Sequence, residues 1–318
     1  MNVGDRVALV APAGPLSPDL LTAGVAALAG WGVHVTLGAH VRDRHPTLPY
    51  LAGTDTDRAA DLRAAWCDPT IDAVLCARGG YGSQRLLDLL DWTALAATKP
   101  KPLVGSSDTT ALLHMFAARL HAPTVFGPMI ATKAFAADPL ARARLYRCLC
   151  QPDLPIVVTG PDAGPLTDRT GGLARGITAG GNASLLAALT AAAPPPPDGS
   201  ILLLEDITED AYRLDGIITR LLRAGWLTRA AGIALGSWTK CGPLDLVRAM
   251  LADRLAGLGV PVAWGLTFGH CPGQASIPLG APAELDADAG TLTVRWPAGT
   301  MSPVGHRSPI SVRTSSAR

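Results

Sequence analysis

Short apolar runs alternate with helical patterns along the first half of the chain. The runs are rich in Val, Leu and Ala and are bounded by Gly, Pro or charged residues, which is typical of strands buried on both faces. Between them, apolar residues recur on one helical face, as Ala59, Leu62 and Trp66 do. We expect strands at 7–14, 33–37, 71–77 and 102–105, and helices at 18–30, 55–67, 83–92 and 109–120. This alternation predicts a parallel sheet covered by helices on both sides.

Gly and Pro are concentrated at 151–171, which indicates a linker between two domains, 1–150 and 172–298. Beyond it, a buried helix is expected to begin at Ala183 with Asn182 as its cap. The pattern also predicts strands at 201–204, 232–235 and 291–296 and helices around 214–224 and 244–258. Residues 299–318 are rich in Ser, Pro and Arg without apolar periodicity, and we expect them to be disordered.

Charge and composition exclude whole classes of partner. Lys and Arg number 27 and Asp and Glu 26, so the net charge is near +1. Binding to a nucleic-acid backbone or to an anionic membrane needs a concentrated positive field, which this chain lacks. The 48% apolar content is enough for a large core. We therefore expect a globular protein with neither nucleic-acid nor membrane partners.

No segment has the features of a targeting signal or a membrane span. Only seven apolar or small residues separate Arg6 from Gly14, and the longest charge-free stretch, 176–197, contains glycines and ends in prolines. The six cysteines form no C-x-x-C pair, and neither His34 nor His40 shows metal-ligand spacing. We therefore expect a cytoplasmic protein with reduced thiols and without a bound metal.

The segment around Ser107 could carry a nucleophile. A buried strand ends at Gly105 and is followed by Ser106, Ser107 and Asp108 and then by a helix. A sharp strand-to-helix turn of this kind pushes a hydroxyl into solvent, and the helix amides behind it stabilise negative charge. The usual G-x-S-x-G pattern is not met, because position 109 is Thr where that pattern has Gly. A simple helix cap is an equally good interpretation of these residues.

A carboxylate and a histidine elsewhere could complete a catalytic set. Glu205 follows four aliphatic residues at the carboxyl end of a strand, where open α/β sheets place their sites, and could orient a histidine. Taken alone, Glu205 is better explained as a solvated strand end, and Asp206 is better explained as surface charge. His270 lies in a short Gly- and Pro-rich loop, and such loops bring side chains to a site. His114 is instead expected to pack or to lie on the surface of its helix.

Glycines at 79, 80 and 82 form a further candidate site. They lie between a strand and a predicted helix and expose backbone N–H groups, as an oxyanion hole or a phosphate cradle requires. Arg85 stands where a dinucleotide motif has its third glycine, and no G-x-x-x-x-G-K-[ST] occurs in the chain. The dinucleotide interpretation is therefore poor and a P-loop enzyme is excluded, and a plain turn remains the alternative.

Taken together and in this order, these segments resemble the LD-carboxypeptidase family of serine peptidases, which also includes the microcin C immunity hydrolases. The similarity runs from Val7 to about Trp296. Its motifs are VAPAG at 10–14, AGTD at 52–55, RAADL at 58–62, RGGYG at 78–82, GSSDTT at 105–110, GGN at 180–182, LED at 204–206, YRLD at 212–215 and FGH at 268–270. Phe126, Gly216 and Gln274 depart from the residues usual in the family. None of the three touches the family's catalytic triad.

The resemblance implies a triad of Ser107, Glu205 and His270, with the backbone N–H groups of Gly80 and Asp108 as the oxyanion hole. It also implies a flavodoxin-like parallel-sheet N-terminal domain, joined to a smaller β-rich α/β C-terminal domain. Ser107 would then lie on one domain, and the other two triad residues on the other. The family usually forms homodimers, and its chemistry needs no metal or organic cofactor.

The implied reaction is hydrolysis of an amide between an L-centre and a terminal D-residue, with release of D-alanine from murein tetrapeptide in cell-wall recycling. In the Gly-rich segment, Arg78 and Tyr81 are candidates for binding this substrate, since a guanidinium pairs bidentately with a carboxylate. The alternative within the same chemistry is an immunity-type hydrolase of peptidyl or aminoacyl sulfamoyl-adenylates. That branch carries an extra loop between nucleophile and glutamate, for which the 98 positions from Ser107 to Glu205 leave little room. A non-catalytic two-domain ligand-binding protein is the alternative from a different class, but it has no need of all three triad residues.

Overall fold

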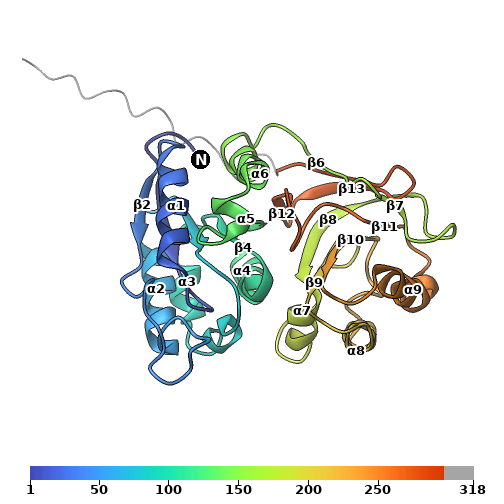
Figure 1. Ribbon diagram of the computed structural model, residues 1–318, viewed down its shortest axis with the longest axis horizontal. Helices are drawn as coiled ribbons and strands as arrows, with labels where there is room; N and C mark the ends of the chain where they lie inside the picture. Colours follow the sequence, from blue (N-terminus) through green and yellow to red (C-terminus); the bar gives the residue numbers. More distant parts are fainter. Residues whose placement is uncertain (297–318) are drawn as a thin grey trace, which may run out of the picture.

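The structure is a computed structural model that describes residues 1–296. The expected disorder of 299–318 lies outside these residues. The chain forms two sheets, one of six strands and one of eight, which stand side by side with helices packed against them (Figure 1). None of the helices in the described part of the chain is long and apolar enough to cross a membrane.

The first sheet has the strand order of the flavodoxin-like folds. Its order is β12-β5-β4-β3-β1-β2, in which the five strands of the first half pair in parallel and β12 joins β5 antiparallel. The strands are β1 (Arg6–Val10), β2 (His34–Leu37), β3 (Ala73–Cys76), β4 (Leu103–Gly105), β5 (Thr124–Phe126) and β12 (Ile277–Leu279). Val7 and Leu9 lie in one apolar cluster, whereas Ala8 and Val10 lie in another. Both faces of the sheet are therefore covered, and the expected flavodoxin-like half is confirmed.

The helices of the first half differ from the expected set at 83–92, and two of them, α5 (Lys133–Ala136) and α6 (Pro139–Cys150), were not expected. The others are α1 (Pro18–Ala29), α2 (Asp55–Cys67), α3 (Trp92–Ala96) and α4 (Thr110–Leu120). The expected helix at 83–92 is wrong: a short 3₁₀ turn, Ser83–Leu86, is followed by a new helix that begins at Trp92. The side chain of Asp91 accepts hydrogen bonds from the N–H groups of Thr93 and Ala94. This cap starts α3 at the point where the apolar pattern suggested that a helix ends.

The second sheet is mixed and forms a β-rich α/β half, as expected. Its order is β6-β14-β13-β8-β9-β10-β11-β7, in which β8 to β11 are parallel and the outer strands pair antiparallel. The strands are β6 (Ile156–Val158), β7 (Gly164–Pro165), β8 (Leu173–Asn182), β9 (Ile201–Ile207), β10 (Gly232–Thr239), β11 (Val262–Trp264), β13 (Pro282–Asp286) and β14 (Thr291–Val294). The helices α7 (Ala183–Leu189), α8 (Ala211–Arg223) and α9 (Leu244–Leu255) share one apolar cluster with Leu202 and Leu204 of β9.

Pairing between strands ties the two halves more closely than the expected linker suggested. The segment 151–171 contributes β6 and β7, which form the two edges of the second sheet. Gly and Pro are compatible with these edge positions because an edge strand leaves half of its backbone groups unpaired. From the second half, β12 returns to pair with β5 of the first sheet. The domain boundaries at 150 and 172 therefore stay a prediction.

The strand β8 was not expected, although its end was. Its glycines lie against the neighbouring chain: a Cβ on Gly176 would stand 2.1 Å from the Gly199 carbonyl oxygen, and one on Gly180 would stand 2.2 Å from that of Leu203. Glycine weakens the strand signal in a sequence, although close backbone approach requires it here. At the end of β8, the Asn182 side chain accepts a hydrogen bond from the Leu185 N–H. The expected cap of α7 is thus confirmed.

Candidate active site

Ser107 lies at a strained turn between β4 and α4. Its φ is +55°, a left-handed conformation that costs a residue with a side chain about 1–2 kcal/mol. The turn is held by Thr109, whose N–H and Oγ1 donate to the carbonyl oxygen of Ser106 at 3.1 and 2.8 Å. Ser107 is partly exposed, whereas Ser106 is 5% exposed. The turn thus presents the hydroxyl of Ser107, as a nucleophile elbow does.

The threonine at position 109 has a structural explanation. A Cβ on Gly105 would stand 2.3 Å from the Thr109 Oγ1, so the glycine of β4 makes room for this hydroxyl. The side chain of Thr109 then supplies one of the two hydrogen bonds that hold the turn. The elbow therefore tolerates Thr where the usual pattern has Gly.

The Gly-rich loop that follows β3 packs directly on Ser107. A Cβ on Gly79 would lie 3.1 Å from the Ser107 Oγ, so any larger residue would press on the hydroxyl. Gly80 has a φ of +107°. Within residues 1–296, the N–H groups of Gly80 and Asp108 have no hydrogen-bond partner. These two donors are therefore available beside the hydroxyl's turn.

Two buried charged groups hold this loop in place. Arg58 of α2 is 1% exposed and donates to the carbonyl oxygens of Pro12 and Gly82. The Asp108 carboxylate accepts a hydrogen bond from the Ser83 N–H at 2.8 Å, and the Ser83 hydroxyl donates to the Asp108 carbonyl at 2.6 Å. Burial raises the pKa of Asp108, against the hydrogen bonds from Ser83. The loop and the serine turn are therefore fixed to each other.

Glu205 and His270 form a hydrogen-bonded pair. Glu205, on β9, is fully buried, and its Oε2 lies 2.7 Å from His270 Nδ1 and accepts the His270 backbone N–H at 3.2 Å. Burial lowers the pKa of His270, but the hydrogen bond and charge of Glu205 and the charge of Asp206 raise it more, so the net shift is upward. The His270 side chain is 24% exposed, and its Nδ1 is the ring atom that faces the carboxylate. The carboxylate thus orients the imidazole and favours its protonated form.

Asp206 was expected to be surface charge, and this expectation is wrong. It is 1% exposed, because the first turn of α7 covers the end of β9 at which Asp206 lies. Its carboxylate accepts hydrogen bonds from the Ser184 N–H at 2.8 Å, the Ser184 Oγ at 3.1 Å and the Asn182 Nδ2 at 3.0 Å. Burial and the charge of Glu205 raise the pKa of Asp206 to about 6, against these hydrogen bonds.

Asn182 links these carboxylates to the turn that carries Ser107. Its Nδ2 also lies 3.2 Å from Glu205 Oε1, and its backbone N–H donates to the Thr110 Oγ1 at the start of α4. The two halves meet again where the rings of Phe126 and Phe268 pack edge to face, 6.3 Å between centroids. Sequence reasoning assigned Asn182 only a capping role. The GGN motif alone does not indicate that this amide contacts two acids.

The structure therefore shows two groups of predicted site residues: Glu205 with His270 in one half, and Ser107 with Gly80 and Asp108 in the other. No hydrogen bond of the described residues joins the Ser107 hydroxyl to His270. Their connection runs through Thr110 and Asn182 to Glu205.

Arg78 and Tyr81 lie at the rim of the Gly-rich loop. Arg78 is exposed, and its guanidinium donates to the carbonyl oxygen of Pro15. Tyr81 is 53% exposed and packs edge to face on Tyr50. Both are accessible from the solvent side of the loop, and their role in binding a substrate stays a prediction.

Two further side chains, His114 and Cys271, have surroundings that do not favour a nucleophilic role. His114 stacks on Trp226 at 4.9 Å, and its Nε2 lies 2.8 Å from the Pro194 carbonyl oxygen, so it packs between elements as expected. Burial raises the pKa of the Cys271 thiol to about 11, which leaves little thiolate at neutral pH.

Comparison with known proteins identifies the family. The family model for the LD-carboxypeptidase N-terminal domain matches residues 7–127, and that for the LD-carboxypeptidase C-terminal domain matches residues 175–285. This chain belongs to the LD-carboxypeptidase family. The resemblance drawn from the motifs is therefore confirmed, and the protein is a hydrolase of the serine-type LD-carboxypeptidases.

Relatives of this LD-carboxypeptidase match it over nearly the whole chain. A protein of Streptomyces coelicolor is 52% identical over 93% of this chain and 94% of its own. The murein tetrapeptide carboxypeptidase of Pseudomonas aeruginosa is 34% identical over 92% of this chain and 96% of its own. Among solved structures, the muramoyltetrapeptide carboxypeptidase of Oxalobacter formigenes has a TM-score of 0.79 at 28% identity and covers 92% of this chain and 99% of its own. An MccF-like protein of Bacillus anthracis has a TM-score of 0.81 at 23% identity, with coverage of 93% and 98%, and shares the fold.

Proposed function

We propose that this protein removes the terminal D-alanine from murein tetrapeptide, through an acyl-enzyme formed on Ser107. The observation that carries the proposal is the contact of the buried Glu205 with the partly exposed His270, 2.7 Å from Oε2 to Nδ1. This pair is joined through Asn182 to the turn of a strained and partly exposed serine. Two relatives named for murein or muramoyl tetrapeptides support the substrate class.

In the proposed reaction, His270 Nε2 takes the proton of the Ser107 hydroxyl as its Oγ attacks the scissile carbonyl. Glu205 holds Nδ1 and stabilises the imidazolium that forms. His270 then gives the proton to the leaving amine of D-alanine, and the C–N bond breaks. A water molecule, deprotonated by His270, attacks the acyl-enzyme and releases the shortened peptide and Ser107.

The proposed oxyanion hole consists of the N–H groups of Gly80 and Asp108. Both lack an internal partner in the described chain and border the Ser107 turn. A donor of this kind stabilises the tetrahedral intermediate by about 3 kcal/mol. We assign Arg78 and Tyr81, which are exposed beside this loop, to binding the free carboxylate of the terminal residue. The chemistry described needs neither a metal nor an organic cofactor.

An immunity-type hydrolase of sulfamoyl-adenylates is the alternative with the same catalytic residues. Its support is the similarity to an MccF-like protein. At 23% identity, this similarity shows a shared fold and nothing about the substrate. Between Ser107 and Glu205 the chain builds α4 to α7 and β5 to β8, so elements of the two sheets take up most of this interval. We therefore favour the tetrapeptide.

The deciding experiment incubates the purified full-length protein with murein tetrapeptide and measures free D-alanine with a D-amino-acid oxidase assay. The same peptide ending in L-alanine is the stereochemical control, and an aminoacyl sulfamoyl-adenylate is the competing substrate. We expect D-alanine release that Ser107→Ala removes. Cleavage of the sulfamoyl-adenylate alone would establish the alternative, and cleavage of neither would favour a ligand-binding protein.

We propose further that the protein acts in the cytoplasm as a homodimer. Light scattering of the purified protein would test the assembly, since a dimer has twice the chain mass of 32.8 kDa. Fractionation of the cells that make it would test the location.

A further inference from the structure

A histidine far from the triad is held in a fixed orientation by a buried carboxylate. His40 follows β2, and its Nδ1 lies 2.9 Å from Asp61 Oδ1, while its backbone N–H donates to Asp61 Oδ2 at 2.9 Å. Asp61 is 7% exposed, and a Cβ on Gly38 would stand 2.4 Å from its Oδ2, so the carboxylate has little freedom. These contacts leave Nε2 as the ring nitrogen that points away from the protein core.

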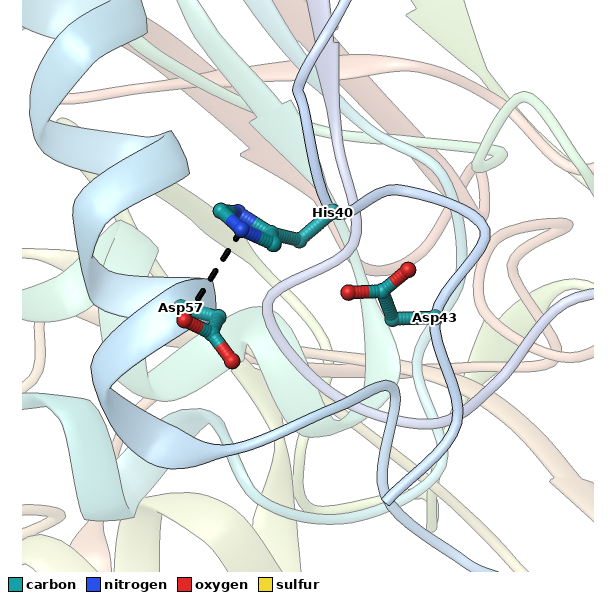
Figure 2. Close-up of side chains that lie close together, drawn as sticks. All are labelled: His40, Asp43 and Asp57. Carbon is teal, nitrogen blue, oxygen red and sulfur yellow. Dashed lines mark ion pairs between the residues drawn. The ribbon is translucent and has the colours of Figure 1, made fainter. Parts of the chain in front are cut away.

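The carboxylates of Asp43 and Asp57 also lie near the His40 ring (Figure 2). Asp57 Oδ1 lies 3.8 Å from His40 Nε2, and the ligand atoms of His40, Asp43 and Asp57 all lie within 4.8 Å of one another. The other oxygen of Asp57 accepts the Thr54 hydroxyl at 2.6 Å, which leaves Oδ1 to face the histidine. Gly53 packs against Asp43, since a Cβ on Gly53 would stand 3.2 Å from the Asp43 Cβ.

We propose that His40, Asp43 and Asp57 bind a divalent transition-metal ion of the Zn²⁺ type. One imidazole nitrogen and two carboxylate oxygens are a ligand set that Zn²⁺ accepts, with water in the remaining position. Ligand atoms around such an ion lie roughly 3–3.5 Å apart, so the three ligand atoms, which lie within 4.8 Å of one another, must draw closer around the ion. The 3.8 Å separation of Nε2 and Oδ1 needs only a small side-chain adjustment. Within the described residues, neither Asp43 nor Asp57 has an ion pair with Lys or Arg that would compete for its carboxylate.

The contacts behind the ligands fit this assignment. Metal-binding histidines nearly always give their second ring N–H to a carboxylate or carbonyl, which fixes the tautomer and raises the basicity of the ligating nitrogen. Asp61 supplies that contact to His40, and Thr54 supplies a hydrogen bond to Asp57. His40 and Asp57 are partly exposed and Asp43 is exposed, so an ion and its waters have a path to the site.

The site lies on a different part of the sheet from the triad and is expected to act on stability. Ser107 follows β4 and His40 follows β2, and these strands stand three places apart in the order β4-β3-β1-β2. At about 4.8 Å between neighbouring strands, the two strands are about 14 Å apart. A bound ion would join the loop after β2 to the first turn of α2. That helix carries Arg58, which holds the Gly-rich loop through Gly82.

The test is calorimetric titration of Zn²⁺ into the full-length protein after treatment with a chelator, with Mg²⁺ in a parallel titration. We expect one saturable Zn²⁺ site, a rise in Tm on binding, and much weaker Mg²⁺ binding, because Mg²⁺ prefers oxygen ligands. His40→Ala is expected to remove both the heat of binding and the Tm shift. Asp61→Asn, which leaves all three ligands in place, should weaken binding by about 10–100-fold.

Two control variants separate this site from other histidines. His34→Ala removes an exposed imidazole from β2, the strand that precedes His40, and His270→Ala removes the proposed catalytic imidazole beside Cys271. Both should bind Zn²⁺ like the wild type. The proposal is overturned if the wild type shows no saturable site, if His40→Ala binds as well as the wild type, or if Mg²⁺ binds as tightly as Zn²⁺. In the first case the cluster is only an ion pair of His40 with Asp57 and Asp61. Hydrolysis by the chelator-treated protein tests the proposed function separately, and we expect it to be unchanged.

Discussion

Gly269 lies directly against the carboxylate of Glu205. A Cβ on this glycine would stand 2.5 Å from Oε2 and 2.8 Å from the carboxyl carbon. Its φ of +89° also turns the chain so that the following residue, His270, reaches the same oxygen with both its N–H and its Nδ1. One glycine therefore sets the geometry of the carboxylate–histidine pair.

Gly269→Ala is expected to lower kcat strongly while the protein stays folded. The added methyl group would push Glu205 away from Nδ1 of His270. Gly242→Ala is the matched control, because its φ is +94° but no atom lies within 4 Å of the new Cβ. Each variant should lose about 1–2 kcal/mol of stability from the left-handed backbone, and only Gly269→Ala should lose activity. Equal kcat values for the two variants would show that the contact with Glu205 does not matter.

Ser107→Ala is expected to abolish hydrolysis with little change in the free energy of unfolding. The substitution removes one partly exposed oxygen that makes no hydrogen bond in the described part of the chain. Ser106→Ala should keep most activity, because the contribution of Ser106 to the turn comes from its backbone carbonyl. Release of D-alanine measures both. If the two variants behave the other way round, the nucleophile is Ser106.

Four strands of the first sheet, β1 to β4, were predictable because they are apolar runs, whereas β5 and β12, of three residues each, were not expected. Val7, Ala8, Leu9 and Val10 are all buried, as strands covered on both faces require. The triad residues were found for a related reason: each follows an apolar run or lies in a Gly-rich loop, which are local signals. Their assignment to one site came from the resemblance, because nothing local joins positions 107, 205 and 270.

The contacts that sequence reasoning missed are made by residues far apart in the chain. Asp206 is buried because Asn182 and Ser184, more than 20 positions earlier, cover it. His40 was set aside as showing no acid or metal-ligand spacing, which overlooked Asp43 three positions later. A helix 15 or more residues later also brings Asp57 and Asp61 to its ring. Pattern and spacing report on neighbours along the chain, whereas these contacts depend on how the elements pack.

Glu205→Gln is expected to lower kcat/KM by about 10³–10⁴-fold and to move its acid limb. His270 must be neutral to accept the Ser107 proton, so activity rises with pH as the imidazole loses its proton. In the wild type the net raised pKa of His270 places this limb above 6.5. Without the charge of Glu205 the limb should shift to lower pH, and the imidazole loses the partner that selects its tautomer. A pH profile with an unmoved limb would mean that Glu205 does not face His270 in solution.

The charge state of Asp206 should control how stability varies with pH. Its pKa in the folded protein is about 6 against an ordinary value of 3.8, because burial and the charge of Glu205 oppose ionisation. The folded chain therefore binds this proton more tightly than the unfolded chain does. The resulting stabilisation is fully present below about pH 4 and is lost as pH rises through about 6, up to about 3 kcal/mol in all.

Asp206→Asn removes this titration and should therefore change the slope of stability against pH. The variant is expected to be less stable than the wild type at every pH, because an amide group cannot accept all the hydrogen bonds from Asn182, Ser184 and Ile207. Its deficit should be largest near pH 4 and should shrink by up to about 3 kcal/mol by neutral pH, where the wild type holds an ionised Asp206 in a buried position. Urea unfolding at a series of pH values measures this difference, and Asp210→Asn, at an exposed acid nearby, is the control that should run parallel to the wild type. A deficit that stays constant with pH would mean that Asp206 titrates in the folded protein as it does in the unfolded chain.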